Sequence, residues 1–175
     1  ASPHMAGAAA VMDQYIREEQ NGLNMPQTDK NQLSYALMMS TALPLKDENG
    51  NLYSPRKQGA GLVRLDKAVT TGAYLLNTDG GRPKAELGDS RDGTYDFSFD
   101  MHSLCDEETA YQVSVTVLTE NTVTENGNTY IAQSSRTLDA DEVTIETVDT
   151  VTLVPRSSKT VDVSLALTST GKQNL

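Results

Sequence analysis

The sequence predicts two successive units, a helical piece followed by an antiparallel β-sandwich. In the first 75 residues or so, apolar side chains recur at steps of three and four, the spacing of a helix with one buried face. From about residue 94 the apolar residues alternate with polar ones, which is the period of a half-buried strand. The polar, turn-forming run "NTDGGRP" at 77–83 lies between them. We therefore expect units at 1–80 and 83–168, with a tail at 169–175.

The first element is a helix predicted from Met5 to Glu19. Its shared face consists of Met5, Ala8, Ala9, Met12, Tyr15 and Ile16. The stretch "MAGAAAVM" at 5–12 is apolar or small on every side, which is typical of a helix enclosed by other elements. Asn21-Gly22 provides the expected stop, because both residues tolerate the left-handed conformation.

Two further helices and a turn complete the first unit. A helix is expected from about Asp29 to Thr41, and "KDENGNLYS" at 46–54 predicts two short arms around an Asn-Gly turn rather than a calcium loop. Gly59 and Gly61 are expected to open a third helix. The inward residues of that helix would be Leu62, Leu65, Ala68 and Val69. Close packing explains these two glycines better than phosphate binding, because no apolar strand precedes them.

The second unit is predicted from alternation and turns. Three sets of apolar residues occupy every second position: Tyr95, Phe97, Phe99 and Met101; Tyr111, Val113, Val115 and Val117; Val161, Val163, Leu165 and Leu167. Asn126-Gly127 predicts a hairpin turn. Six or seven short strands separated by polar turns indicate an antiparallel sandwich.

Charge is distributed unevenly and excludes two classes of partner. Residues 1–82 carry eight basic and eight acidic side chains, whereas residues 83–175 carry six and sixteen, a net charge of −10. A basic face is needed to neutralise phosphates or to adsorb to an anionic membrane, so neither nucleic acid nor a membrane surface is an expected partner. No apolar run reaches the roughly 18 residues of a membrane span, and no charged leader with an apolar core is present.

Few residues suit catalysis. His4 stands at a helix start, and His102 falls on the expected outer face of a strand beside Asp100. Cys105, the lone cysteine, is expected to be inert. The acidic run at 139–142 is expected to be a solvated turn rather than a weak calcium site. No His and Cys have metal-ligand spacing, so the residues predict no catalytic, cofactor-binding or metal site.

The opening stretch has a close counterpart in a known family. "ASPHMAGAAAVM" at 1–12 resembles the segment after the nucleophile in subtilisin-like serine proteases, whose signature is Gly-Thr-Ser-Met-Ala-Ser-Pro-His, a hydrophobic residue, Ala and Gly. Ala1 to Gly7 match its latter part. "ALMMSTALPLKDENGNLYSPRKQGAGLVRLDKAV" at 36–69 resembles the end of the catalytic domain in large cell-envelope subtilases, the lactocepin and complement-cleaving peptidase type. The second half resembles the fibronectin type III-like domain that follows.

The resemblance implies an α/β remnant of a subtilisin-like domain at 1–80 and a fibronectin type III-like sandwich at 83–168. The catalytic serine would lie two residues upstream of Ala1, so Ser2 is not the nucleophile. In this family the triad runs Asp, His, Ser, so all three would precede Ala1. The parent would be a secreted or cell-wall bacterial serine endopeptidase that acts on proteins or peptides without a cofactor. This chain would be inactive alone, with the sandwich as a structural accessory.

Two alternatives remain at this stage. The chain could be a non-catalytic adhesion or protein-interaction module, or one product of nicking held in a complex with the upstream piece. We also expect another polypeptide, either the upstream catalytic portion or a second copy, to cover the helix at Met5 to Ile16. The competing possibility is that this helix folds back onto Leu33, Leu37, Leu62 and Leu65.

Overall fold

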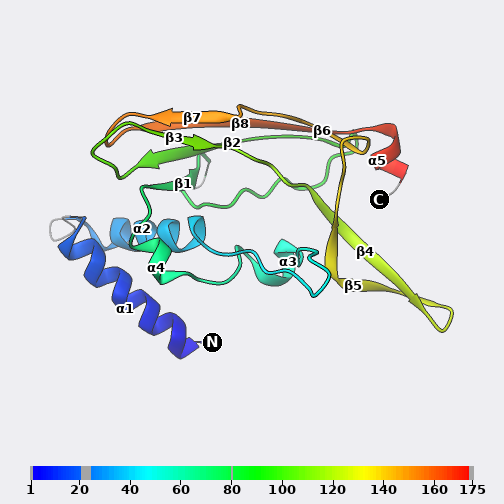
Figure 1. The fold of residues 1–175 in the computed structure, drawn as a ribbon, viewed down its shortest axis with the longest axis horizontal. Coiled ribbons are helices and arrows are strands. Elements are labelled where there is room, and N and C mark those ends of the chain that lie inside the picture. Colours follow the sequence, from blue (N-terminus) through cyan, green and yellow to red (C-terminus); the bar gives the residue numbers. More distant parts are fainter. Residues whose placement is uncertain (1, 21–24, 80, 174–175) are drawn as a thin grey trace.

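The computed structural model describes residues 2–20, 25–79, 81–173 and consists of a helical layer beside a β layer (Figure 1). The expected stop at Asn21-Gly22 lies outside the described residues. The helices are α1 (Ser2–Glu18), α2 (Gln27–Ser40), α3 (Pro55–Gln58), α4 (Leu65–Ala68) and α5 (Ser169–Gln173). The strands are β1 (Ala73–Asn77), β2 (Thr94–Ser103), β3 (Thr109–Gln112), β4 (Leu118–Glu125), β5 (Asn128–Thr137), β6 (Val143–Glu146), β7 (Thr150–Leu153) and β8 (Ser158–Leu167).

The first two predicted helices are confirmed, and they pack together. One face of α1 supplies Ala8 and Met12 to a core that α2 completes with Leu37 and Met38. Ile16, one turn after Met12, is also fully buried. Met5 and Ala9, which the spacing places on the same face, are exposed, so the helix is not enclosed on all sides as expected.

The prediction of a helix opened by Gly59 and Gly61 is right only in part, because the short helix α4 begins later, at Leu65. Leu65, Ala68 and Val69 pack in the core as expected. Gly59 ends α3 with a φ of 64°, and the chain then runs extended, with Leu62 paired to Leu43 through two backbone hydrogen bonds of 2.9 Å. Leu62 is 53% exposed rather than inward. The close-packing explanation is confirmed at Gly61, where a Cβ would overlap the Leu43 carbonyl. Only a residue without a side chain fits this pairing at a φ of 118°.

The sheets of the β layer are all antiparallel and compatible with a sandwich. One sheet has the order β1-β2-β8-β6, and the pairs β3-β7 and β4-β5 form two more. The alternation is confirmed in β2 and β8, where Met101, Val161 and Val163 are buried. Met101 and Val161 contribute to the apolar cluster that joins the larger sheet to the β3-β7 pair. Residues 113–117 keep the expected alternation but are not part of a strand.

β1 is an element that the spacing of the sequence does not predict. It pairs with β2 from Ala73↔Ser103 to Asn77↔Phe99, so residues before the polar run at 77–83 belong to the sheet. Beyond the sandwich, the tail contains α5, whose Gly171 packs against the backbone of Glu142. The division at about residue 80 therefore separates two runs of sequence that share one sheet.

The predicted hairpin turn at Asn126-Gly127 is confirmed. Both residues have positive φ, 52° and 79°, and Glu125 pairs with Asn128 across the turn. The β4-β5 hairpin extends away from the sheet past α3 (Figure 1). Its base contacts the helical layer, because Lys57 Nζ donates to the Ala132 carbonyl at 2.6 Å and Ser134 pairs with Tyr53.

Candidate functional site: an uncovered apolar face on the helical layer

Half of α1 faces solvent although its residues are apolar or small. Met5 is 43% and Val11 45% exposed, and Ala6, Gly7, Ala9 and Ala10 are exposed between them. A Cβ added at Gly7 would meet nothing within 4 Å. Small side chains allow another backbone to approach this face closely.

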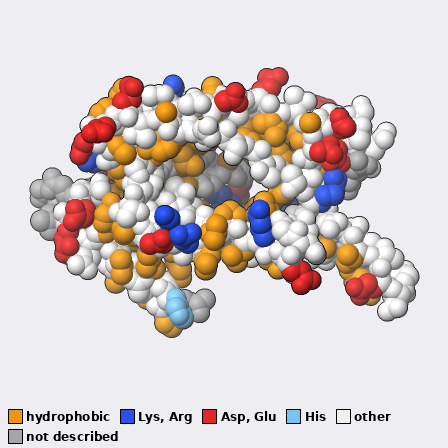
Figure 2. Space-filling view, viewed as in Figure 1, with side chains coloured by type: hydrophobic (Ala, Val, Ile, Leu, Met, Phe, Trp, Pro, Cys, Tyr) orange, Lys and Arg blue, Asp and Glu red, His pale blue; other side chains and the backbone are white. Residues whose placement is uncertain are grey.

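Exposed apolar side chains also occur outside α1. Other exposed large apolar residues of the helical layer are Tyr35 on α2 and, in the paired extended segments, Leu43, Leu45 and Leu62. Hydrophobic side chains are visible across the helical layer in Figure 2. Monomeric proteins rarely expose large contiguous apolar patches, so a cluster of exposed apolar side chains is a candidate contact surface. We call the exposed side of α1 with these four residues the apolar face.

The expectation that another polypeptide covers the helix from Met5 to Ile16 is wrong for Met12 and Ile16. Both are fully buried within this chain, so they need no other polypeptide to cover them. The fold-back alternative is right for Leu33, Leu37 and Leu65, which belong to or pack against the same core. It is wrong for Leu62, which lies on the apolar face.

The two histidines lie on different elements. His4 is exposed in the first turns of α1, near Ser2, which is also exposed. His102 lies on β2 and stacks on Tyr74 of β1, with ring centroids 4.9 Å apart and an angle of 6° between the rings. The expected surface position of His102 is therefore wrong in part, because the β1 strand that the spacing missed covers its ring. Burial raises the pKa of Tyr74.

Cys105 is half-buried beside Gly72 and Tyr111. Its Sγ lies 3.5 Å from the Gly72 carbonyl oxygen and 3.9 Å from Tyr111 Oη. The pKa of Tyr111 is raised, mainly by burial and secondly by its contact with the Cys105 thiol. These contacts give the thiol a packing role and bring no His or carboxylate to it.

The acidic run at 139–142 is only in part the solvated turn that was expected. Asp139 and Asp141 are exposed in a turn, where Asp139 Oδ1 accepts the Asp141 N–H at 2.9 Å. Glu142 is buried and pairs with Arg136, with Nη1 to Oε2 at 2.6 Å. This pairing raises the pKa of the Arg136 guanidinium. Within the described ranges, no group of three or more His, Cys, Asp or Glu side chains could hold a metal ion.

No helix in the described part of the chain combines the length and apolar character that a bilayer span requires.

No protein-family model matches the chain. Individual relatives do match parts of it. The chain is 37% identical over 84 residues to the minor extracellular protease Vpr of Bacillus subtilis, which covers 45% of this chain and 9% of that protein.

Two other kinds of relative match longer stretches. C5a peptidase of Streptococcus pyogenes is 29% identical over 117 residues, 65% of this chain and 10% of that protein. The PII-type proteinase of Lactococcus lactis subsp. cremoris is 32% identical over 111 residues, 57% of this chain and 6% of that protein. The matched region is thus a tenth or less of each relative's length. Over the matched part of its length, the chain is a distant homologue of these subtilisin-like proteases, as the sequence predicted.

Proposed function

We propose that the chain is the C-terminal part of a subtilisin-like catalytic domain joined to a fibronectin type III-like accessory sandwich. The parent is a secreted or cell-wall serine endopeptidase that cuts proteins or peptides through an acyl-enzyme. The observation that carries the proposal is the burial pattern of α1. The helix that begins with the Ser-Pro-His-Met-Ala-Gly motif packs one face on α2 and leaves the other apolar face open.

This pattern fits the position of such a helix in a catalytic domain. The nucleophilic serine would stand just before α1, at the N-terminal end of the helix. Backbone N–H groups and the positive end of the helix dipole converge there and favour a developing oxyanion. The remaining sheet of the catalytic domain would cover Met5, Val11 and the small residues between them. The general base and its orienting acid, which a serine nucleophile needs, would come from that upstream part.

The β layer supports the accessory role in this proposal. It is attached to the helical layer through β1 and the base of the β4-β5 hairpin. Neither attachment involves a residue of α1. The sandwich would therefore brace the catalytic domain without covering the surface that the upstream part needs.

The first test uses the 175-residue chain alone. We expect no reaction with a fluorophosphonate probe and no cleavage of casein, because the nucleophile and base would be missing. Stoichiometric labelling of any serine in this chain would contradict the proposal.

The second test uses the natural gene. The codons immediately before Ala1 should encode Gly-Thr-Ser-Met, and the protein that includes the upstream sequence should cleave casein. Replacing that serine with alanine should abolish cleavage, whereas Ser2→Ala should retain it. Equal loss of activity in both variants, with the fold intact by circular dichroism, would show that the assignment of the nucleophile is wrong.

A further inference from the structure

The sandwich has an extended segment, residues 113–117, whose backbone is almost unpaired. Val113 N–H donates to the Asp149 carbonyl at 2.9 Å, and the Val117 carbonyl accepts from Leu138 N–H at 2.9 Å. Between these two bonds, Ser114, Val115 and Thr116 form no backbone hydrogen bond with any described residue. The segment continues directly from β3, which pairs only with β7 within the described part of the chain. The middle of this segment, which lies outside the strands, thus has a free backbone edge.

The sequence of this edge lacks the usual protection against pairing. Residues 109–117 read "TAYQVSVTV", with no charge, no Pro and no Gly, and five of the nine are Val or Thr. Natural edge strands generally carry a Lys, a Pro or a bulge that prevents another strand from adding to them. An uncharged β-prone edge is a template for a further strand.

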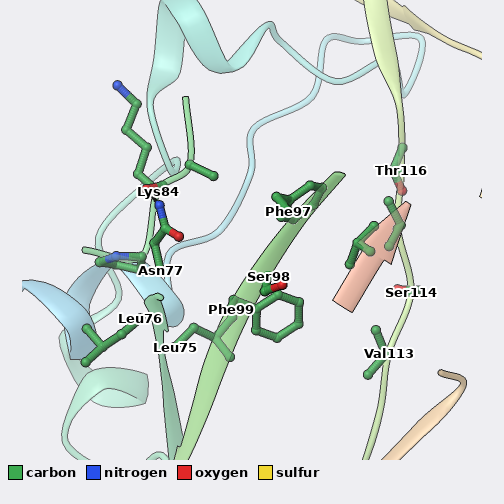
Figure 3. A pocket seen from close by; sticks show the side chains of 14 residues that line it. Leu75, Leu76, Asn77, Lys84, Phe97, Ser98, Phe99, Val113, Ser114 and Thr116 are labelled. Atoms are coloured by element: carbon green, nitrogen blue, oxygen red, sulfur yellow. Dashed lines mark hydrogen bonds between the residues drawn. The ribbon is translucent and has the colours of Figure 1, made fainter. Parts of the chain in front are cut away.

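An apolar cavity lies beside the same edge. It has a volume of about 360 Å³, and its floor is formed by Leu75, Phe97, Phe99 and Val163. Residues 113–116 line one wall, and residues 83–85 line it from another part of the chain. In Figure 3, Val113, Ser114 and Thr116 lie on one side of Phe97 and Phe99, with Asn77 and Lys84 on the other. Because four consecutive residues line it, the cavity follows the edge of the segment and not one of its faces.

We propose that this edge groove, residues 113–116 with the cavity beside them, binds an extended peptide that adds as a strand to the segment. The peptide's backbone would pair with Ser114 to Thr116, and its alternate apolar side chains would enter the cavity above Phe97 and Phe99. Four residues of an added strand span about 13 Å. This proposal does not depend on the catalytic role proposed above.

The charge around the edge identifies the partner as basic. Glu107 and Glu108 precede the uncharged stretch, and residues 83–175 have a net charge of −10. Asp106 and Glu120, on either side of the stretch, are paired with Arg156 and Arg56. A second copy would bring the same charge to the groove, and like charges at an interface oppose association. A peptide whose apolar residues alternate with polar ones, with lysines or arginines at its ends, fits both the apolar cavity and the negative charge around it.

The test uses the full 175-residue chain and a fluorescein-labelled probe followed by anisotropy. The probe is a nine-residue peptide of alternating Leu and Thr, with two lysines at each end. Two further probes carry N-methyl groups on alternate residues, one set for each edge of the peptide strand. We expect one methylated probe to bind at least about tenfold more weakly and the other to match the parent, because only one peptide edge donates hydrogen bonds.

Two controls address charge and the protein edge. A probe with glutamates at its ends should bind at least about tenfold more weakly than the lysine probe. Ser114→Pro should abolish binding while Ser114→Ala retains it, because proline removes an N–H from the edge. Circular dichroism checks that the proline variant is folded. The methylated probes test, on the unaltered chain, whether backbone hydrogen bonds join the peptide to the edge.

Three outcomes would overturn the proposal. Equal binding of both methylated probes would show that no ladder forms. Equal binding of the glutamate and lysine probes would exclude a basic partner. A dimer in light scattering that Ser114→Pro dissolves would identify a second copy as the occupant.

Discussion

The burial pattern of α1 makes a sharp prediction about two methionines on one helix. Met12 is fully buried against α2, whereas Met5, seven residues earlier on the same helix, is 43% exposed. Both changes to alanine replace the same side chain in the same type of secondary structure, so differences in helix propensity cancel. The difference in stability between the two variants therefore measures packing alone.

The magnitudes differ by several fold. Replacing a buried methionine with alanine costs about 2–5 kcal/mol through lost burial and the cavity that remains. A surface substitution stays within about 0.5 kcal/mol. Because small domains have total stabilities of about 5–15 kcal/mol, Met12→Ala would remove a large fraction of the total.

Urea denaturation of each variant, followed by circular dichroism, measures the free energies of unfolding. We expect Met12→Ala to lower the midpoint strongly and Met5→Ala to leave it nearly unchanged. Equal losses for the two variants would refute the assignment of the buried face, since they would place Met5 in a core of its own.

Three other predictions concern contacts between different segments of the fold. Gly61→Ala should reduce the free energy of unfolding by roughly 2 kcal/mol more than Gly50→Ala, because both have positive φ but only Gly61 abuts a carbonyl; thermal unfolding compares them. Glu142→Gln should cost about 1–3 kcal/mol in urea denaturation, because it removes the charge beside the half-buried Arg136. Residues 71–173 should unfold cooperatively and at higher temperature than residues 83–173, because the shorter piece lacks β1; equal melting temperatures would show that β1 does not stabilise the sandwich.

The sequence predicted those helices, strands and turns that are determined by residues close together in the chain. α1 and α2 follow from apolar spacing, and the hairpin at Asn126-Gly127 follows from residues that accept positive φ. The alternation in β2 and β8 predicted their buried faces because each strand has one polar side.

The errors concern contacts between distant segments. Gly61 was assigned to a helix because its own neighbours are helix-like, whereas its conformation is set by the pairing of the next residue, Leu62, with Leu43, nineteen residues earlier. β1 was missed for a similar reason, since "AYLLN" is apolar at four of five positions and shows no period of two. The edge groove could not be predicted, because its lining comes from five separate stretches of the chain.

The same feature that hid β1 explains how the two layers are joined. A strand that is apolar on both sides can serve two cores at once. Ala73 and Leu75 face the core between the sheets, while Tyr74 packs against the core of the helices. Ser40 of α2 accepts a hydrogen bond from the Leu75 N–H at 2.9 Å, which ties the helical layer to the strand between those side chains. Because removal of β1 would expose both cores, the helical layer and the sandwich should unfold together, and a shift in one should be transmitted to the other through this strand.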